Sequence, residues 1–177
     1  AGTPTTKSLG AAAFAISATG GASGKAVIVS SNTPTVCSVT DGTVAINSAG
    51  TCTLAANQSG NDDYHAASEK THNIAVGTGT QAVNFATSTP TNKVMGDADF
   101  AVTANGGASG KPVVVTSNTA AICTVSSGAV SILKAGVCTL AANQAGNANY
   151  DAAIETTHDI MIGKGTQIIS FASNTPT

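Results

Sequence analysis

The chain has 177 residues, and its 7 lysine or arginine and 9 aspartate or glutamate residues give a formal net charge of −2. This balance provides no basic surface for nucleic acid and no polybasic patch for an anionic membrane, and no apolar run approaches the ~20 residues of a membrane-spanning helix. Charged residues make up 9% and tryptophan is absent. The small and β-branched residues that dominate favour short strands joined by tight turns.

Apolar and polar residues alternate in short stretches from residue 12 onward, which predicts a series of strands, the first over 12–18. Turn-forming residues separate the stretches, notably the glycine-rich segment 20–24 and the Asp41-Gly42 dipeptide. A polar loop with one aromatic residue, Tyr64, spans 57–67. The residues expected to face inward are, in chain order, Phe14, Ile16, Val27, Val29, Cys37, Val39, Val44, Ile46, Cys52, Leu54, Ala56, His72, Ile74 and Val76.

The segment 27–58 returns without a gap as 113–144. Its two cysteines shift by the same amount, since 123 − 37 = 86 and 138 − 52 = 86. A unit of this size is large enough to bury its own core. About seven short strands with turns every 8–12 residues are typical of an immunoglobulin-like sandwich. We therefore expect an all-β chain of tandem immunoglobulin-like β-sandwiches.

The repeat predicts three segments. Repeat 1 covers 1–77 and lacks its first strand, repeat 2 covers 78–163, and 164–177 is either the opening strand of a third repeat or a donor strand. The chain starts at Ala1 without a signal-like segment, so we expect it to be mature or excised from a longer protein.

The predicted assembly strand lies in the last segment. Repeat 2 opens with QAVNF at 81–85, and the tail offers QIISF at the same spacing. Ile169 and Phe171 would then take the inward positions of Val83 and Phe85. The strand consists of Gln167, Ile168, Ile169, Ser170 and Phe171.

The four cysteines form one pair per repeat, with 52 − 37 = 15 and 138 − 123 = 15 positions between the partners. Zinc sites use tighter spacing, such as CxxC. We predict the disulfides Cys37–Cys52 and Cys123–Cys138, and with them an oxidising compartment. Two buried free thiols per repeat are the alternative.

The other polar groups predict no catalytic, cofactor or metal site. Segment 20–25 is similar to a phosphate-binding loop, but it lacks the first glycine and the hydroxyl that holds magnesium. Residues 61–63 (NDD) suggest calcium, but the second copy has no carboxylate there, so we expect a solvated turn with Tyr64 packed on the sheet edge. His72 and His158 recur without a repeated nucleophile beside them, which favours a packing role.

Four motifs of the central segment resemble the bacterial immunoglobulin-like domains found in tandem in invasin- and intimin-type adhesins. They are VSSNTP at 29–34, VCSV at 36–39, GTVAI at 42–46 and AGTCTL at 49–54, and similar motifs return 86 positions later. Because those families usually have a small residue in place of each cysteine, the chain is closer to a cysteine-bearing subgroup with a QxxxF opening strand and an ANQxGNxxY loop. The resemblance implies an extracellular or cell-surface location, while the fold alone does not specify a function.

Some surface immunoglobulin-like domains also join a lysine to an asparagine beside an acid. Such an isopeptide bond requires the three groups to be buried together. The residues that recur in both repeats and make such a bond possible are Lys7, Asn57 and Glu69, and Lys93, Asn143 and Glu155.

We therefore expect a structural repeat of an extracellular bacterial stalk or fibre, without catalysis or cofactor. Its partners would be adjacent repeats or copies of itself, joined head to tail by strand donation. The alternative is an adhesive module that contacts a host protein or carbohydrate through sandwich loops. The most divergent loop between the copies is 62–65 against 148–151.

Overall fold

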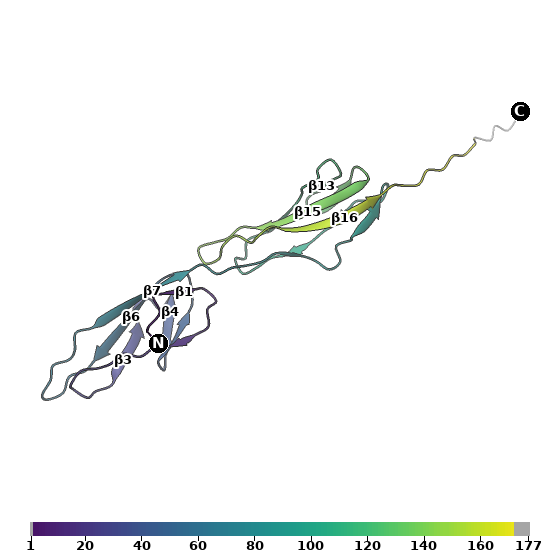
Figure 1. Cartoon of the computed structure of the whole chain (residues 1–177). Coiled ribbons are helices and arrows are strands. Elements are labelled where there is room, and N and C mark those ends of the chain that lie inside the picture. The colour runs from purple at the N-terminus through teal and green to yellow at the C-terminus, as the bar shows by residue number, and fades with distance from the viewer. Residues whose placement is uncertain (1, 172–177) are drawn as a thin grey trace, which may run out of the picture. The chain divides into compact units, whose positions relative to one another are not determined.

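A computed structural model describes residues 2–171 (Figure 1), and it confirms the all-β fold, since every regular element in this part is a strand. The described residues form two compact units. Unit 1 contains residues 2–81 and 146–152, and unit 2 contains residues 82–145 and 153–171. Residue 1 of the predicted repeat 1 and residues 172–177 of the predicted segment 164–177 lie outside the described residues.

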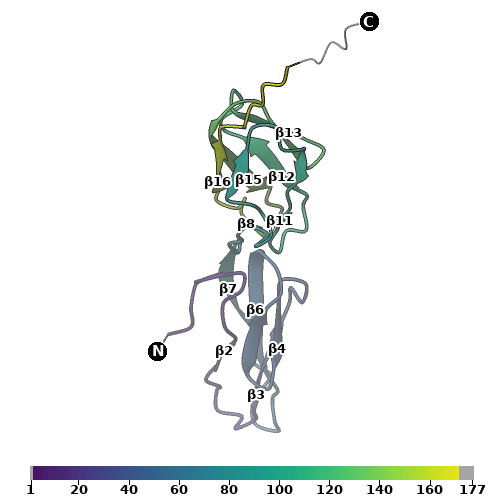
Figure 2. The same cartoon turned by 90° about the vertical axis from the view of Figure 1, so that its right-hand side faces the viewer.

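Unit 1 is a sandwich of a four-stranded and a three-stranded sheet (Figure 2). The first sheet has the order β1 (Thr6–Ser8), β7 (Lys70–Gly77), β6 (Gly50–Gln58) and β3 (Val27–Ser31). The second has the order β2 (Phe14–Ala15), β5 (Thr43–Ile46) and β4 (Cys37–Thr40). Strands β1 and β7 pair in parallel, and the other pairs are antiparallel. The predicted strand 12–18 is thus shorter than expected.

Unit 2 repeats both sheets. The four-stranded sheet has the order β12 (Val113–Ser117), β15 (Gly136–Gln144), β16 (Thr156–Gly163) and β9 (Asn92–Val94). The other has the order β10 (Phe100–Ala101), β14 (Ala129–Ile132) and β13 (Cys123–Ser126). Unit 2 also contains an antiparallel pair of β8 (Asn84–Phe85) and β11 (Ala104–Asn105), which has no counterpart among the described residues of unit 1.

The core of each unit lies between its two sheets, because successive side chains of a strand alternate between its faces. The shared apolar residues come from both sheets and are at most 2% exposed. Burying a Val, Leu or Ile side chain contributes about 1.5–3 kcal/mol. In the two units they are Val44, Leu54 and Ile74, and Val130, Leu140 and Ile160.

The hairpin between β4 and β5 turns on the Asp-Gly dipeptide. Asp41 has φ 47° and Gly42 has φ 72°, and in unit 2 Ser127 and Gly128 have φ 47° and 78°. Positive φ at both central residues is the requirement of a type I′ turn, whose twist matches that of the strands. This turn therefore aligns β4 with β5 and sets Cys37 on the inner face.

A buried glutamine fastens the glycine-rich loop in each unit. The Gln144 side chain is 4% exposed; its Oε1 accepts a bond from the Gly107 amide and its Nε2 donates to the Lys111 carbonyl, both at 2.7 Å. Gln58 makes the equivalent two bonds in unit 1. Segment 20–25 is thus a structural connection held from inside. Sequence analysis missed this role, although the glutamine recurs.

Replacing Gln144 by leucine is expected to lower the free energy of unfolding of unit 2 by about 2–4 kcal/mol. Two backbone groups would lose their partners, and each buried unsatisfied group costs about 1–3 kcal/mol. Urea denaturation measures the change. Gln167→Leu, at an exposed glutamine, is the control and should shift stability by less than about 0.5 kcal/mol. A Gln144→Leu protein as stable as its parent would contradict the assignment.

Candidate functional site

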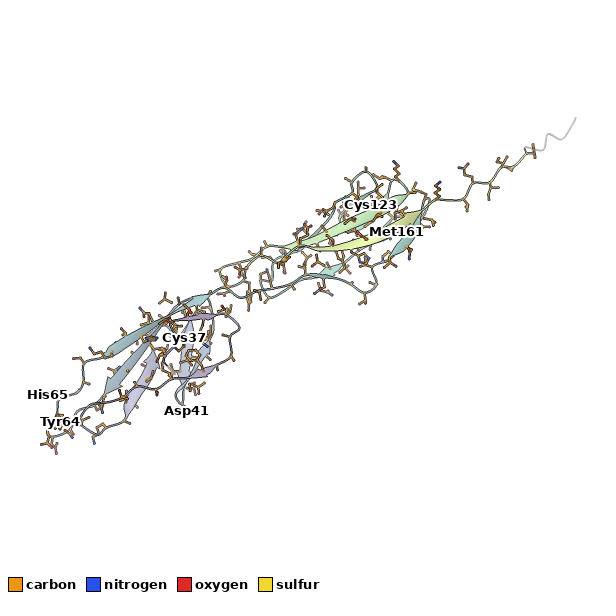
Figure 3. All side chains as sticks on the ribbon, viewed as in Figure 1. Cys37, Asp41, Tyr64, His65, Cys123 and Met161 are labelled. Carbon is orange, nitrogen blue, oxygen red and sulfur yellow. A yellow bond between two sulfur atoms is a disulfide. The ribbon has the colours of Figure 1, made fainter. Side chains whose placement is uncertain are left out.

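A disulfide joins the two sheets of each unit. Cys37 of β4 is bonded to Cys52 of β6, with an S–S distance of 1.99 Å and a Cα–Cα distance of 5.5 Å, and Cys123 of β13 is bonded to Cys138 of β15. All four residues are 0% exposed, and Figure 3 labels one cysteine of each pair, Cys37 and Cys123. The structure contains no free cysteine in its described part, so the alternative of buried thiols does not apply. Because solvent does not reach the sulfur atoms, the role of the bridges is to stabilise the fold of each unit.

Replacing Cys37 and Cys52 together by alanine is expected to lower the free energy of unfolding of unit 1 by about 3 kcal/mol, the usual contribution of closing a loop of this length. Guanidinium denaturation followed by residue-resolved NMR assigns the loss to a unit. The matched control, Cys123→Ala with Cys138→Ala, should destabilise unit 2 instead. Equal stability of parent and double variant under oxidising conditions would show that the bridge does not stabilise the fold.

The polar loop of unit 1 is an Asx turn. The Asn61 Oδ1 accepts bonds from the amides of Asp63 at 3.0 Å and Tyr64 at 2.8 Å, which is the usual use of asparagine in a turn. Asp62 and Asp63 are exposed, and residues 2–171 contain no group of three or more His, Cys, Asp or Glu side chains that could hold a metal ion. The expected packing of Tyr64 on the sheet edge is wrong: its side chain is 51% exposed (Figure 3).

The recurring histidines tie the last strand to the first segment of each unit. The His72 Nε2 lies 2.9 Å from the Pro4 carbonyl oxygen, and the His158 Nε2 lies 3.0 Å from that of Pro90. Both side chains are half-buried. In each unit the histidine Nε2 can donate a hydrogen bond to the proline carbonyl. These histidines therefore have the packing role that the sequence favours.

The residues of the isopeptide hypothesis do not meet, and that hypothesis is wrong. Lys7 pairs with Val76 near the end of β7, and its ammonium lies 4.6 Å from the centroid of the Phe14 ring. Asn57 instead donates to Glu69 at 3.0 Å on the surface, beside the start of β7. Seven strand positions at ~3.3 Å each separate the lysine from the asparagine by roughly 20 Å, too far for a bond.

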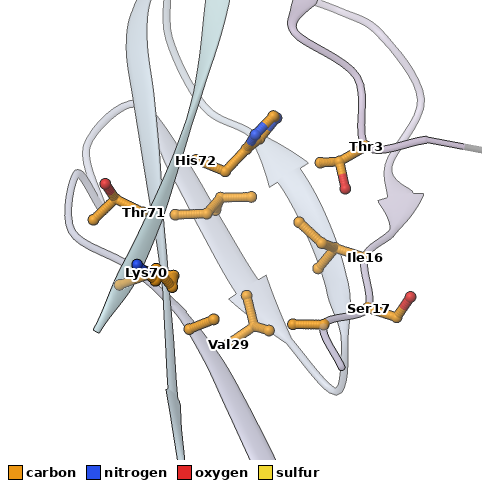
Figure 4. Close-up of a pocket in the computed structure, with 11 residues that line it drawn as sticks. Thr3, Ile16, Ser17, Val29, Lys70, Thr71 and His72 are labelled. Atoms are coloured by element: carbon orange, nitrogen blue, oxygen red, sulfur yellow. The ribbon is translucent and has the colours of Figure 1, made fainter. Parts of the chain in front are cut away.

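An apolar groove opens in unit 1 beside β6 and β7. It encloses about 180 Å³, and Figure 4 shows Ile16, Val29 and His72 around this space, from the segment after β2, from β3 and from β7. The other lining residues are the apolar Ala18, Leu54, Ala55 and Ala56 and the polar Thr3, Ser17, Lys70 and Thr71. Nothing in the sequence of one repeat marks these residues as a site. Only a comparison of the two copies reveals that their surroundings differ.

The predicted assembly strand lies apart from any sheet. Residues 164–171 belong to no strand, and the side chains of Ile168, Ile169 and Phe171 are 92%, 91% and 99% exposed. This arrangement leaves the strand assignment of Gln167–Phe171 a prediction. None of residues 2–171 lies in a helix that is long and apolar enough to cross a membrane.

No protein-family model matches the chain, and no curated protein matches it either. Among the solved structures that are similar, three are named here. Domains 4–9 of the surface-layer protein SbsC share 21% identity at a TM-score of 0.37, over 86% of this chain and 24% of that chain. The EC1–4 fragment of Drosophila N-cadherin shares 14% at 0.34, over 80% and 42%. The C-terminal 282-residue fragment of intimin, solved with the intimin-binding domain of the translocated intimin receptor, shares 19% at 0.32, over 80% and 53%.

The chain therefore spans about a quarter to a half of the length of these structures. At such TM-scores the similarity does not assign a function.

Proposed function

We propose that the chain is a structural repeat of an extracellular bacterial surface stalk or fibre, non-catalytic, whose copies join head to tail by donating a strand. The observation that carries the stalk role is the parallel pairing of the first and last strands of each four-stranded sheet. In unit 1, Thr6 pairs with Ala75 and Ser8 with Gly77. In unit 2, Asn92 pairs with Met161, and β9 runs parallel to β16 in the same way.

Parallel pairing has a mechanical consequence. Because the first and last strands point the same way, the chain enters a unit at one end and leaves it at the other. Tension along the chain then loads the hydrogen bonds of this pair in shear, together rather than one by one. In unit 1 these include the bond from the Leu9 amide to the Gly77 carbonyl at 2.9 Å and that from the Ala75 amide to the Thr5 carbonyl at 2.9 Å. A unit of this kind suits a load-bearing spacer.

The buried disulfides support the extracellular part of the proposal. Structural disulfides form and persist in oxidising environments and are rare in the cytosol. Each bridge also limits how far a unit extends under load, because residues between the bonded cysteines cannot be pulled apart. The same bond thus fits both the location and the mechanical role.

One observation favours the alternative of an adhesive module. The loop residues 62–65 of unit 1 are all exposed, and Tyr64 presents an aromatic ring there, whereas the equivalent Tyr150 is half-buried. Exposed tyrosines are frequent contact residues in protein interfaces. If this loop binds a host protein, Tyr64→Ala should remove the binding without lowering the stability of unit 1.

Pulling single molecules by their ends tests the stalk role. Two unfolding events are expected, each at a distinct force. While the bridge is intact, the 15 chain positions between its cysteines, at ~3.4 Å each, cannot extend beyond the Cα–Cα distance of the bridge. Reduction of the disulfides should therefore lengthen each extension by about 45 Å. Force spectroscopy in the presence and absence of a reductant measures this difference.

Two proline variants identify the resisting strands. Leu9→Pro removes the amide that donates to Gly77, and Met95→Pro removes the equivalent donor to Gly163. Each should lower the force of one event and leave the other unchanged. Units that extend without a force peak, or variants that leave both peaks unchanged, would contradict the load-bearing role.

A further inference from the structure

We propose that the loop of residues 146–152 is a docking element that holds the segment 78–81 within unit 1, and that Asn149 and Asp151 determine which segment this loop accepts. The inference goes beyond the proposed function, since it requires neither load nor strand donation. It begins from the composition of unit 1, which includes both segments, although 73 positions separate Thr78 from Asp151.

Backbone hydrogen bonds align the two segments inside unit 1. The Gly79 amide donates to the Asn149 carbonyl at 2.8 Å, and the Asp151 amide donates to the Gly79 carbonyl at 3.0 Å. Gly79 and Tyr150 thereby form an isolated parallel bridge. Because Gly79 uses both of its backbone groups, the segment is bound in the way an added strand is bound, by main-chain bonds that fix its register.

Three side-chain hydrogen bonds add chemical selectivity to this backbone pairing. The Thr78 hydroxyl donates to Asp151 Oδ1 at 2.7 Å, and Gln81 Nε2 donates to the Asp151 carbonyl at 2.8 Å. In addition, Asn149 Oδ1 accepts a bond from the Ala49 amide at 3.0 Å. Asp151 therefore binds the segment 78–81, while Asn149 binds the residue that precedes β6.

The contact with Gly79 leaves no room for a larger residue. Gly79 is buried and Tyr150 is half-buried. A Cβ added at Gly79 would lie 3.0 Å from the Tyr150 ring and 3.1 Å from the Leu9 carbonyl oxygen. A side chain at this position would therefore displace the ring or the carbonyl, so the loop accepts a segment that has glycine here.

The loop forms its own shape before it contacts the segment. Asn147 Oδ1 accepts bonds from the amides of Asn149 at 2.8 Å and Tyr150 at 2.9 Å. The Asn147 amide donates to the Tyr150 carbonyl at 2.9 Å. All three bonds lie within the loop. A loop that is ordered in this way loses little conformational entropy when it docks.

The docking side chains are also those in which the two copies of the loop differ. The turn asparagine and the tyrosine are the same in both copies. Repeat 1 has Asp63 in the position of Asn149. It has His65 in the position of Asp151, so an imidazole replaces the carboxylate that accepts the hydroxyl bond. The divergence between the copies therefore changes docking contacts while it preserves the turn.

A double-mutant cycle tests the hydroxyl–carboxylate bond in the intact chain. Thr78→Val and Asp151→Ala should each raise the hydrogen-exchange rate of the Gly79 amide about 3- to 10-fold, because each removes a bond that stabilises docking. The double variant should exchange no faster than the faster single variant, since both changes remove the same bond. Residue-resolved NMR measures the rates. Fully additive effects would overturn the pairing of these two residues.

Asp151→His introduces the residue of the other copy and tests selection directly. It should accelerate exchange of the Gly79 amide as much as Asp151→Ala does, because the carboxylate acceptor is lost in both. A rate equal to that of the parent chain would overturn Asp151 as a residue that determines which segment the loop accepts.

Asn149→Ala tests the second docking contact and should raise the exchange rate of the Ala49 amide about 3- to 10-fold. The matched control is Asp63→Ala, at the equivalent position of the other loop, which should change the Ala49 rate less than ~2-fold. The Ile160 amide of unit 2 should exchange at the parent rate in every variant. Equal effects of the two alanine variants, or a general acceleration that includes Ile160, would overturn local docking by this loop.

Discussion

The covalent bond between the sheets is the constraint on which each unit depends. The chain has no tryptophan and only four phenylalanines, so its cores are built from valine, leucine, isoleucine and the cystines themselves. A small domain with few large side chains buries limited apolar surface. The bridge restricts the unfolded chain and also fills the centre of the core. Small residues elsewhere in the strands are tolerated because the two sheets cannot separate.

The sequence predicts much of this core because its signals are local. Alternation places Val44, Leu54 and Ile74 on inner faces, and the Asp41-Gly42 dipeptide specifies the turn that aligns β4 with β5. Cysteine spacing indicates the bridged pair once the alternation shows both facing inward. In each of these cases a few neighbouring residues carry the information, and the 86-residue repeat supplies a second, independent copy of it.

What the sequence does not reveal depends on distant contacts. The strand Thr6–Ser8 is three residues long without apolar alternation, and it exists because β7 pairs with it in parallel. The role of Gln58 depends on backbone groups that only the folded loop brings to it. The isopeptide hypothesis failed for the same reason: recurrence shows that residues matter, but it does not show that Lys7 and Asn57 lie together.

The two copies also show how an opening strand packs against a sandwich. In unit 2, β8 pairs with β11 and places the Phe85 ring beside the His158 ring. In unit 1 an apolar groove lies at the equivalent position, beside strands that the disulfide joins to the other sheet. The bridge joins the two sheets in both units, so the covalent constraint also supports the surface against which an opening strand packs.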